Sequence, residues 1–201
     1  MSIGEHSFYA AVPTLKFVTP GEMSMTETAE QYKNRLHSFL AGSDPLAIME
    51  DTPYRLQQLL RDRTAAELDQ SRGAGTWSAR QVLCHLADAE MVLGYRARTA
   101  LASSGEPLQS FEQDLWASER PYAGVDIELA LRTFTAIRAW NLDLFTRLGD
   151  GQLDRYGVHS VRGRESIRDM VRLYGGHDLN HLQQIEQILE QPARLVGAST
   201  E

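Results

Sequence analysis

The chain has 201 residues, a formal net charge of −7, one cysteine and 42% hydrophobic residues. This length fits one domain with a full core, and the acidic balance argues against nonspecific binding to nucleic acid. No apolar run reaches the ~20 residues of a membrane helix, and no basic segment precedes an apolar one at the N-terminus, so we expect neither a membrane span nor a secretory signal. The single Cys84 excludes an internal disulfide and favours the cytoplasm.

Apolar spacing at the helical period predicts an all-α chain, and no alternating pattern long enough for a strand competes with it. Glycines, prolines and N-cap residues such as Ser78 and Ser166 mark where helices begin and end. The expected helices are an accessory helix over 26–40 and four bundle helices over 45–63, 78–103, 126–148 and 166–191. We divide the chain into an irregular N-terminal arm with the accessory helix, 1–44, and a four-helix bundle, 45–201.

The connection between the second and third bundle helices, residues 104–125, is long. Short connections join antiparallel neighbours, whereas a long one permits a crossover that leaves consecutive helices parallel. A loop of this length also tends to have a role of its own. Its apolar residues Phe111, Leu115 and Trp116 predict a short helix that covers one end of the bundle.

Two histidines interrupt the apolar face of the last helix. His177 and His181 follow Met170 and Tyr174 and precede Ile185 at helical spacing, so both rings project from a face that should be buried. Burying two imidazoles costs free energy unless their nitrogens find partners. An i,i+4 histidine pair is a common helical way to hold a divalent metal ion. The alternative is a pair of core histidines that hydrogen-bond to backbone or carboxylate groups.

A third ligand is expected from the second bundle helix. Ser78 and Gln81 form a capping-box pattern at its start, and His85 then lies between Val82 and Ala89 on its apolar face. His85 is therefore another imidazole at a position where packing favours a hydrocarbon. If the second and fourth bundle helices are neighbours, three imidazoles converge in the interior.

Three spaced motifs carry a resemblance to a known family. They are GTWSARQVLCHLADAE over 75–90, GRES over 163–166 and HDLNH over 177–181. In this order they resemble the DinB-like superfamily of four-helix-bundle metal-binding proteins, over about residues 45–191. The resemblance implies an up-down-down-up bundle, a homodimer, and a divalent metal, nickel or zinc, bound by His85, His177 and His181.

The resemblance also suggests what the metal does. Three neutral imidazoles leave a coordination position open, as in catalytic rather than structural sites. Relatives in this family include thiol S-transferases, so the most plausible function is a metal-dependent enzyme that acts on a small molecule, with a low-molecular-weight thiol as partner. The alternatives are a metal-dependent hydrolase and a non-catalytic metal-binding protein related to stress. The residues between His177 and His181 include no glutamate that could serve as a general base, which weakens the protease-like hydrolase.

Nearby polar residues have two interpretations each. Asp88, one turn after His85, is a fourth ligand, an acceptor that orients an imidazole, or a solvent-facing charge. Asp178 points about 100° away from His177 and fits an ion pair or an acceptor better than a ligand. His159, in the loop before the last helix, either reaches the mouth of a cavity or caps its loop, and the cap is favoured.

Other residues are expected to have structural roles. Glu90 should pair with Arg80 or Arg96. The arginines that would form surface ion pairs, or else hold an anionic substrate, are Arg96, Arg98 and Arg138. The aromatic residues that would pack in the core, or else line a pocket, are Trp116, Tyr122 and Trp140. Cys84 is expected to be a buried, inert thiol.

Overall fold

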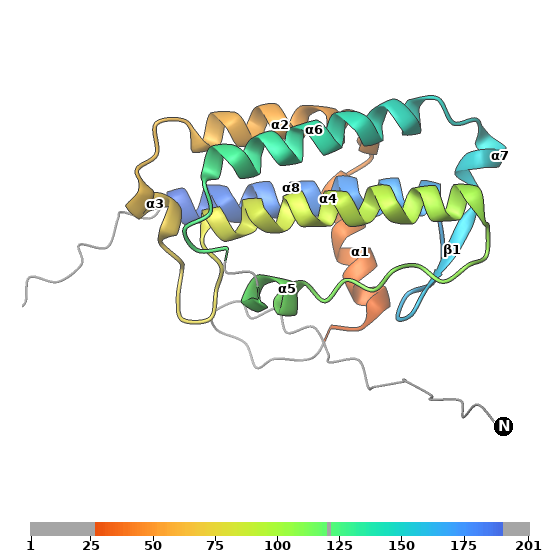
Figure 1. Ribbon diagram of the computed structural model, residues 1–201, viewed down its shortest axis with the longest axis horizontal. Helices are drawn as coiled ribbons and strands as arrows, with labels where there is room; N and C mark the ends of the chain where they lie inside the picture. Colours follow the sequence, from red (N-terminus) through yellow and green to blue (C-terminus); the bar gives the residue numbers. More distant parts are fainter. Residues whose placement is uncertain (1–26, 120–121, 191–201) are drawn as a thin grey trace, which may run out of the picture.

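The chain folds as a helical bundle with an additional helix on one side (Figure 1). The computed structural model describes residues 27–119 and 122–190. The predicted N-terminal arm, residues 1–24, lies outside the described residues, and the division of the chain at residue 44 stays a prediction. No helix in the described ranges is both long and apolar enough to span a membrane.

Four long helices form the bundle: α2 (Pro45–Leu60), α4 (Ala79–Ala102), α6 (Ile127–Thr146) and α8 (Ile167–Leu189). In Figure 1, α2 and α6 lie side by side above α4 and α8, and the two layers pack against each other. α2 and α8 run in one direction while α4 and α6 run in the other, so the predicted up-down-down-up bundle is confirmed. The crossover from α4 to α6 returns along the length of the bundle, which explains why it is long.

Side-chain caps fix where the two histidine-bearing helices begin. The Ser78 hydroxyl accepts a hydrogen bond from the Gln81 amide, and the Gln81 side chain accepts one from the Ser78 amide. α8 begins in the same reciprocal way at Ser166 with Asp169. Each capping box satisfies backbone donors that the helix itself leaves unpaired.

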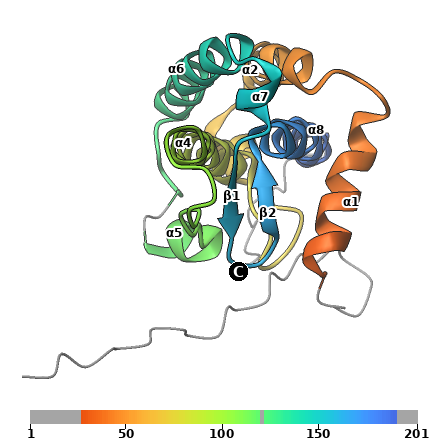
Figure 2. The same ribbon diagram turned by 90° about the vertical axis from the view of Figure 1, so that its right-hand side faces the viewer.

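The accessory helix α1 (Ala29–Leu40) lies against the outer side of α8, as Figure 2 shows. It begins directly after the N-cap Thr28, slightly later than the predicted start at residue 26. Two glycines of α8 allow close approach, one to α1 and the other to the start of α2. A Cβ added to Gly176 would collide with the backbone carbonyl of Leu36 in α1, and one added to Gly175 would lie 3.0 Å from Pro45 Cβ at the start of α2.

Three short helices and one hairpin complete the described chain: α3 (Ala65–Asp69), α5 (Gln113–Glu119), α7 (Asp150–Leu153), β1 (Tyr156–His159) and β2 (Gly163–Ser166). α5 is the short helix predicted within the crossover. The antiparallel hairpin shows that the expectation of no strand was wrong. Each strand has only 4 residues, too few for alternation to stand out, and Gly163 allows the turn with a φ of 74°.

The interior consists of two apolar clusters separated by polar side chains. On α8, Tyr174 belongs to one cluster and Leu182 to the other, with His177 and His181 between them. On α4, Leu86 and Ala89 similarly belong to different clusters. The histidines are therefore held in place by hydrophobic packing on both sides.

We expect Gly176→Ala to lower the free energy of unfolding by about 1–3 kcal/mol, because the added methyl group meets the Leu36 carbonyl and pushes α1 away from α8. Gly151→Ala is the matched control, since a Cβ at this helical glycine of α7 meets no atom within 4 Å. Chemical denaturation measures both variants, and equal stabilities would contradict the close contact of α1 with α8.

Candidate metal centre

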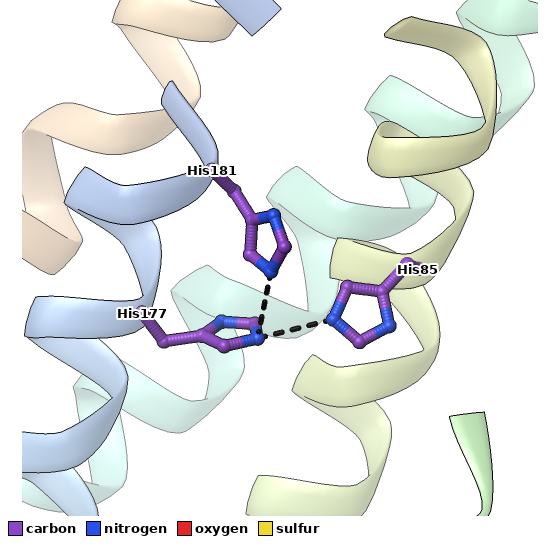
Figure 3. Close-up of side chains that lie close together, drawn as sticks. All are labelled: His85, His177 and His181. Carbon is purple, nitrogen blue, oxygen red and sulfur yellow. Dashed lines mark hydrogen bonds between the residues drawn. The ribbon is translucent and has the colours of Figure 1, made fainter. Parts of the chain in front are cut away.

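Three histidine side chains converge inside the bundle (Figure 3). His85 projects from α4, and His177 and His181 project from α8. Nε2 of His177 lies 3.0 Å from Nε2 of His85 and 3.1 Å from Nε2 of His181. All three side chains are buried, and a ligand nitrogen from each lies within 4.8 Å of the others. The structure thus brings together the three residues that sequence analysis selected.

The separations between these nitrogens fit a shared ion. Two imidazole nitrogens that each lie ~2.0–2.1 Å from one divalent ion are about 2.9 Å apart at a right angle and about 3.4 Å apart at the tetrahedral angle. The observed 3.0 and 3.1 Å between the Nε2 atoms fall in this range. The three residues could therefore hold a metal ion with little movement.

Hydrogen bonding between the rings cannot by itself satisfy these nitrogens. Nδ1 of His181 lies 2.8 Å from Oε1 of Gln184, so His181 donates from Nδ1 and presents the lone pair of Nε2 to His177. His177 uses its Nε2 atom for contacts with both other rings, and a single N–H donates well along only one of them. A cation, in contrast, accepts all three lone pairs at once.

Two of the remaining ring nitrogens have no partner of their own. Nδ1 of His85 and Nδ1 of His177 are buried without a hydrogen-bond partner among the described residues. Leaving buried polar atoms unpaired costs free energy. An ion at the converging Nε2 atoms would place the ring proton on Nδ1 and would leave these two atoms unpaired, so the case for a metal rests on the Nε2 atoms alone.

Burial keeps the three rings neutral. It lowers the pKa of His85 and of His177 well below the usual imidazole value, and the neighbouring ring of His181 lowers both further. Burial also lowers the pKa of His181 to about 4, against the opposing effect of its hydrogen bond with Gln184. Only a neutral imidazole has a lone pair to offer a metal, so the environment prepares these side chains as ligands.

Aromatic rings surround the cluster. The ring of Trp77 lies 5.0 Å from that of His85, and the ring of Phe111, from the crossover, stacks on His85 at 5.9 Å with an interplanar angle of 6°. Tyr174 lies 5.5 Å from the ring of His177. This apolar wall lowers the local dielectric and strengthens electrostatic interactions at the site.

Asp88 is not one of the converging groups. Its carboxylate accepts a hydrogen bond of 2.7 Å from the hydroxyl of Tyr122, and both residues are buried. Of the interpretations that the sequence left open for Asp88, the solvent-facing charge is therefore wrong. The same bond places Tyr122 in the core, as favoured from the sequence.

A buried ion network lies beside the histidines. Arg138 donates hydrogen bonds to the Asp178 carboxylate at 2.5 and 3.0 Å and to Glu90 at 2.8 Å, and Asn141 also binds Glu90. Glu90 thus pairs with Arg138 of α6 and not with Arg80 or Arg96. Arg138 is only 1% exposed, so the expectation of a surface ion pair was wrong for it, whereas Asp178 forms the predicted ion pair.

Other predicted residues have the following positions. Arg80 pairs with Asp69, and Cys84 is buried as expected. Trp140 is 67% exposed beside Arg98, so it neither packs in the core nor lines the cavity at the histidines. Trp116 is partly exposed and packs edge-on against Phe111 of the crossover.

His159 both caps its turn and lines a cavity. Its Nδ1 accepts hydrogen bonds from the amides of Val161 and Arg162 in the hairpin turn. Burial, with the nearby charges of Arg162 and Arg96, lowers the pKa of His159 to about 3. The residue is therefore a neutral cap, and it faces the same cavity as the histidine cluster.

The histidine cluster adjoins a cavity of about 240 Å³. His85 and His177 contribute to its wall, together with residues of α1, the crossover and the hairpin. Apart from the suggestion for His159, the cavity could not be predicted, because its wall combines five segments, from the start of α1 to α8. A small molecule in it would lie next to the ligand nitrogens.

The fold and the site define a class of four-helix bundles with a buried set of three histidines that could bind a metal. The chain belongs to the DinB superfamily, whose family description matches residues 48–185. Sequence analysis had indicated this family, and the match confirms it.

Two proteins of Oceanobacillus iheyensis, each named "Putative metal-dependent hydrolase", are 27% identical to this chain. One aligns over 66% of this chain and 76% of its own length, and the other over 71% and 83%. A solved structure, "YfiT from Bacillus subtilis is a probable metal-dependent hydrolase with an unusual four-helix bundle topology", matches with a TM-score of 0.68 at 21% identity, covering 85% of this chain and 91% of that one. At this identity the structural match shows the shared fold.

The lowered pKa of His181 predicts that the metal-free protein loses stability in acid. The unfolded chain takes up a proton near pH 6.5 and the folded one near pH 4, so stability is complete above pH 6.5 and falls as the pH drops towards 4. We expect a loss of about 2 kcal/mol between pH 7 and pH 5 from this group alone. Urea unfolding at the two pH values, compared with His181→Gln, measures it. An equal loss in the variant would contradict the assignment to His181.

Proposed function

We propose that this protein binds one divalent metal ion through His85, His177 and His181 and uses it to activate a small thiol for transfer to an electrophile. The observation that carries the proposal is the convergence of three buried, neutral imidazoles at the wall of a cavity. Three protein ligands leave a coordination position for a substrate, which distinguishes catalytic from closed structural sites.

The residues around the site support this chemistry. When bound, a divalent ion supplies a Lewis acid that lowers the pKa of a thiol or a water molecule. The three imidazoles are neutral, so they do not reduce the positive charge of the ion. Trp77 and Phe111 cover His85 with aromatic surface, which limits access of bulk water to the ligands.

Both the intrinsic acidity of a thiol and the residues at the site favour a thiol over water as the nucleophile. A free thiol has a pKa of about 8.5 and bulk water one of about 15.7, so the thiol requires far less assistance to lose its proton. Hydrolysis gains from a positioned general base. Within the described ranges, no carboxylate joins the three histidines, because Asp88 binds Tyr122 and Asp178 binds Arg138.

Metal-dependent hydrolysis is the second candidate, and the names of the two Oceanobacillus iheyensis relatives favour it. The third candidate is a non-catalytic metal-binding protein. Nickel and zinc are the metals we propose, since imidazole suits both. We also propose a homodimer, on the basis of the family resemblance, and a cytoplasmic location, because the chain has a single cysteine.

The purified protein should bind one equivalent of Zn²⁺ or Ni²⁺. Substitution of a single ligand, in His85→Ala, His177→Ala or His181→Ala, should weaken binding by at least ~100-fold, because the loss of even an outer partner of a metal ligand costs about 10–100-fold. Isothermal titration and elemental analysis measure this. His37→Ala, which removes an imidazole from α1, is the control and should bind normally. Unchanged binding in the three site variants would contradict the proposal.

The metal-loaded protein should accelerate the reaction of a low-molecular-weight thiol with an electrophile such as monobromobimane. The rate should fall at least ~10-fold on removal of the metal, since thiol activation depends on it. Fluorescence of the thioether product gives the rate. Hydrolysis of p-nitrophenyl acetate without thiol turnover would support the second candidate, and metal binding with neither reaction would support the third.

A further inference from the structure

The cavity beside the histidines extends along α4. His85, Ala89 and Arg96 of this helix contribute to its wall, and the small Ala89 side chain leaves room between the other two. His85 and Arg96 are separated by about three helical turns, or ~16 Å along the axis between their Cα atoms. The cavity therefore offers two chemically different ends, an imidazole cluster and a guanidinium.

Arg96 is buried, and no carboxylate of the described residues forms an ion pair with it. Its side chain is 4% exposed, and its Nε and Nη2 atoms donate to the backbone carbonyl of Gln109 at 2.9 and 2.6 Å. Two nearby carboxylates are already paired, and Glu112, which contributes to the cavity wall, is exposed. Glu165 receives two hydrogen bonds from Arg162, and Glu27 at the cavity receives two from Arg35.

Arg138 shows how this chain accommodates a buried arginine for structural reasons. It is 1% exposed and binds two carboxylates, those of Glu90 and Asp178. Burial by itself lowers the pKa of Arg138, but the two carboxylates outweigh this effect and raise it, whereas burial lowers the pKa of Arg96. Burying a charge without a counterion costs free energy. A purely structural role therefore does not explain why the Arg96 guanidinium is buried at the cavity.

Tyr174 connects the two ends of the cavity. Its ring lies 5.5 Å from the ring of His177, and its phenol is near enough to Arg96 to oppose the effect of burial on the pKa of that arginine. Tyr174 is buried and contributes to the cavity wall. A phenol next to a guanidinium provides a second hydrogen-bond donor for the same anionic group.

We infer that Arg96 binds a carboxylate of the substrate, so that the substrate is an elongated organic acid whose other end reaches the histidine cluster. The inference rests on the proposed function for the reacting end, but the interaction of Arg96 with the carboxylate does not require a metal. The guanidinium gains its missing counterion on binding, and the acid is oriented along the cavity.

Hexanoate and hexanol are the probes that test this interaction, because they differ in the charged group and share the alkyl chain. Ligand-observed NMR titration of the full chain gives both dissociation constants, with the protein metal-loaded and after treatment with a chelator. We expect hexanoate to bind at least ~10-fold more tightly than hexanol in both states, from one charge-assisted hydrogen-bonded pair. Equal affinities for hexanoate and hexanol in the metal-free protein would overturn the inference. The metal-free state is decisive because a bound metal could itself bind the carboxylate.

Variants assign the preference to Arg96. Arg96→Gln should abolish the preference for hexanoate while leaving hexanol binding unchanged, and Arg96→Lys should retain part of it. Arg98→Gln, which removes the same charge from the opposite side of α4, should keep it in full. A preference that survives in Arg96→Gln overturns the inference. If Arg96→Gln does not fold, Arg96→Lys decides the question, because its charge lies at a different position. A preference for hexanoate as large as in the unchanged protein then overturns the inference, and a smaller preference supports it.

The outcome is separable from that of the proposed function. A chain that binds no metal but still prefers hexanoate in an Arg96-dependent way refutes the metal enzyme and retains the carboxylate site. A chain that binds metal and reacts with thiols but shows no such preference retains the enzyme and refutes the carboxylate site.

Discussion

Nε2 of His177 meets the Nε2 atoms of His85 and His181 at 3.0 and 3.1 Å in the buried interior of the bundle, beside the ring of Trp77. Three polar rings in such contact cost free energy unless something satisfies their lone pairs. Hydrophobic clusters on both sides hold α4 and α8 at the distance that creates this contact. Hydrophobic packing thus maintains an unfavourable arrangement of the three rings, which a bound cation would stabilise.

Helix α8 organises the other contacts around this cluster. Consecutive helical residues point about 100° apart, so residues 175–178 face different neighbours. Gly175 and Gly176 admit Pro45 and α1, His177 faces the cluster, and Asp178 binds Arg138 of α6. A single turn of helix therefore positions the accessory helix, the ligand set and the ion network, which couples the wall of the cavity to the core of the bundle.

The bundle and the three histidines could be predicted because each leaves a local signal. His177 and His181 interrupt an apolar stripe, and the Ser78 cap sets the face on which His85 lies. The hairpin escaped prediction because 4-residue strands give too short an alternation. The pairing of Glu90 with Arg138, and the lack of a carboxylate partner for Arg96 among the described residues, depend on which segments become neighbours. The same residue type is therefore a structural cation at one position and a candidate binding group at the other, and periodicity does not distinguish them.

X-ray absorption spectroscopy of the zinc- or nickel-loaded protein tests the central claim most directly, since it reports the ligands of the ion itself. The account predicts scattering from three imidazoles, with metal–nitrogen distances of ~2.0–2.1 Å, and from at least one additional light or sulfur ligand that changes when a thiol is added. A spectrum with fewer than three imidazoles, or one that thiols leave unchanged, would contradict an open site formed by His85, His177 and His181.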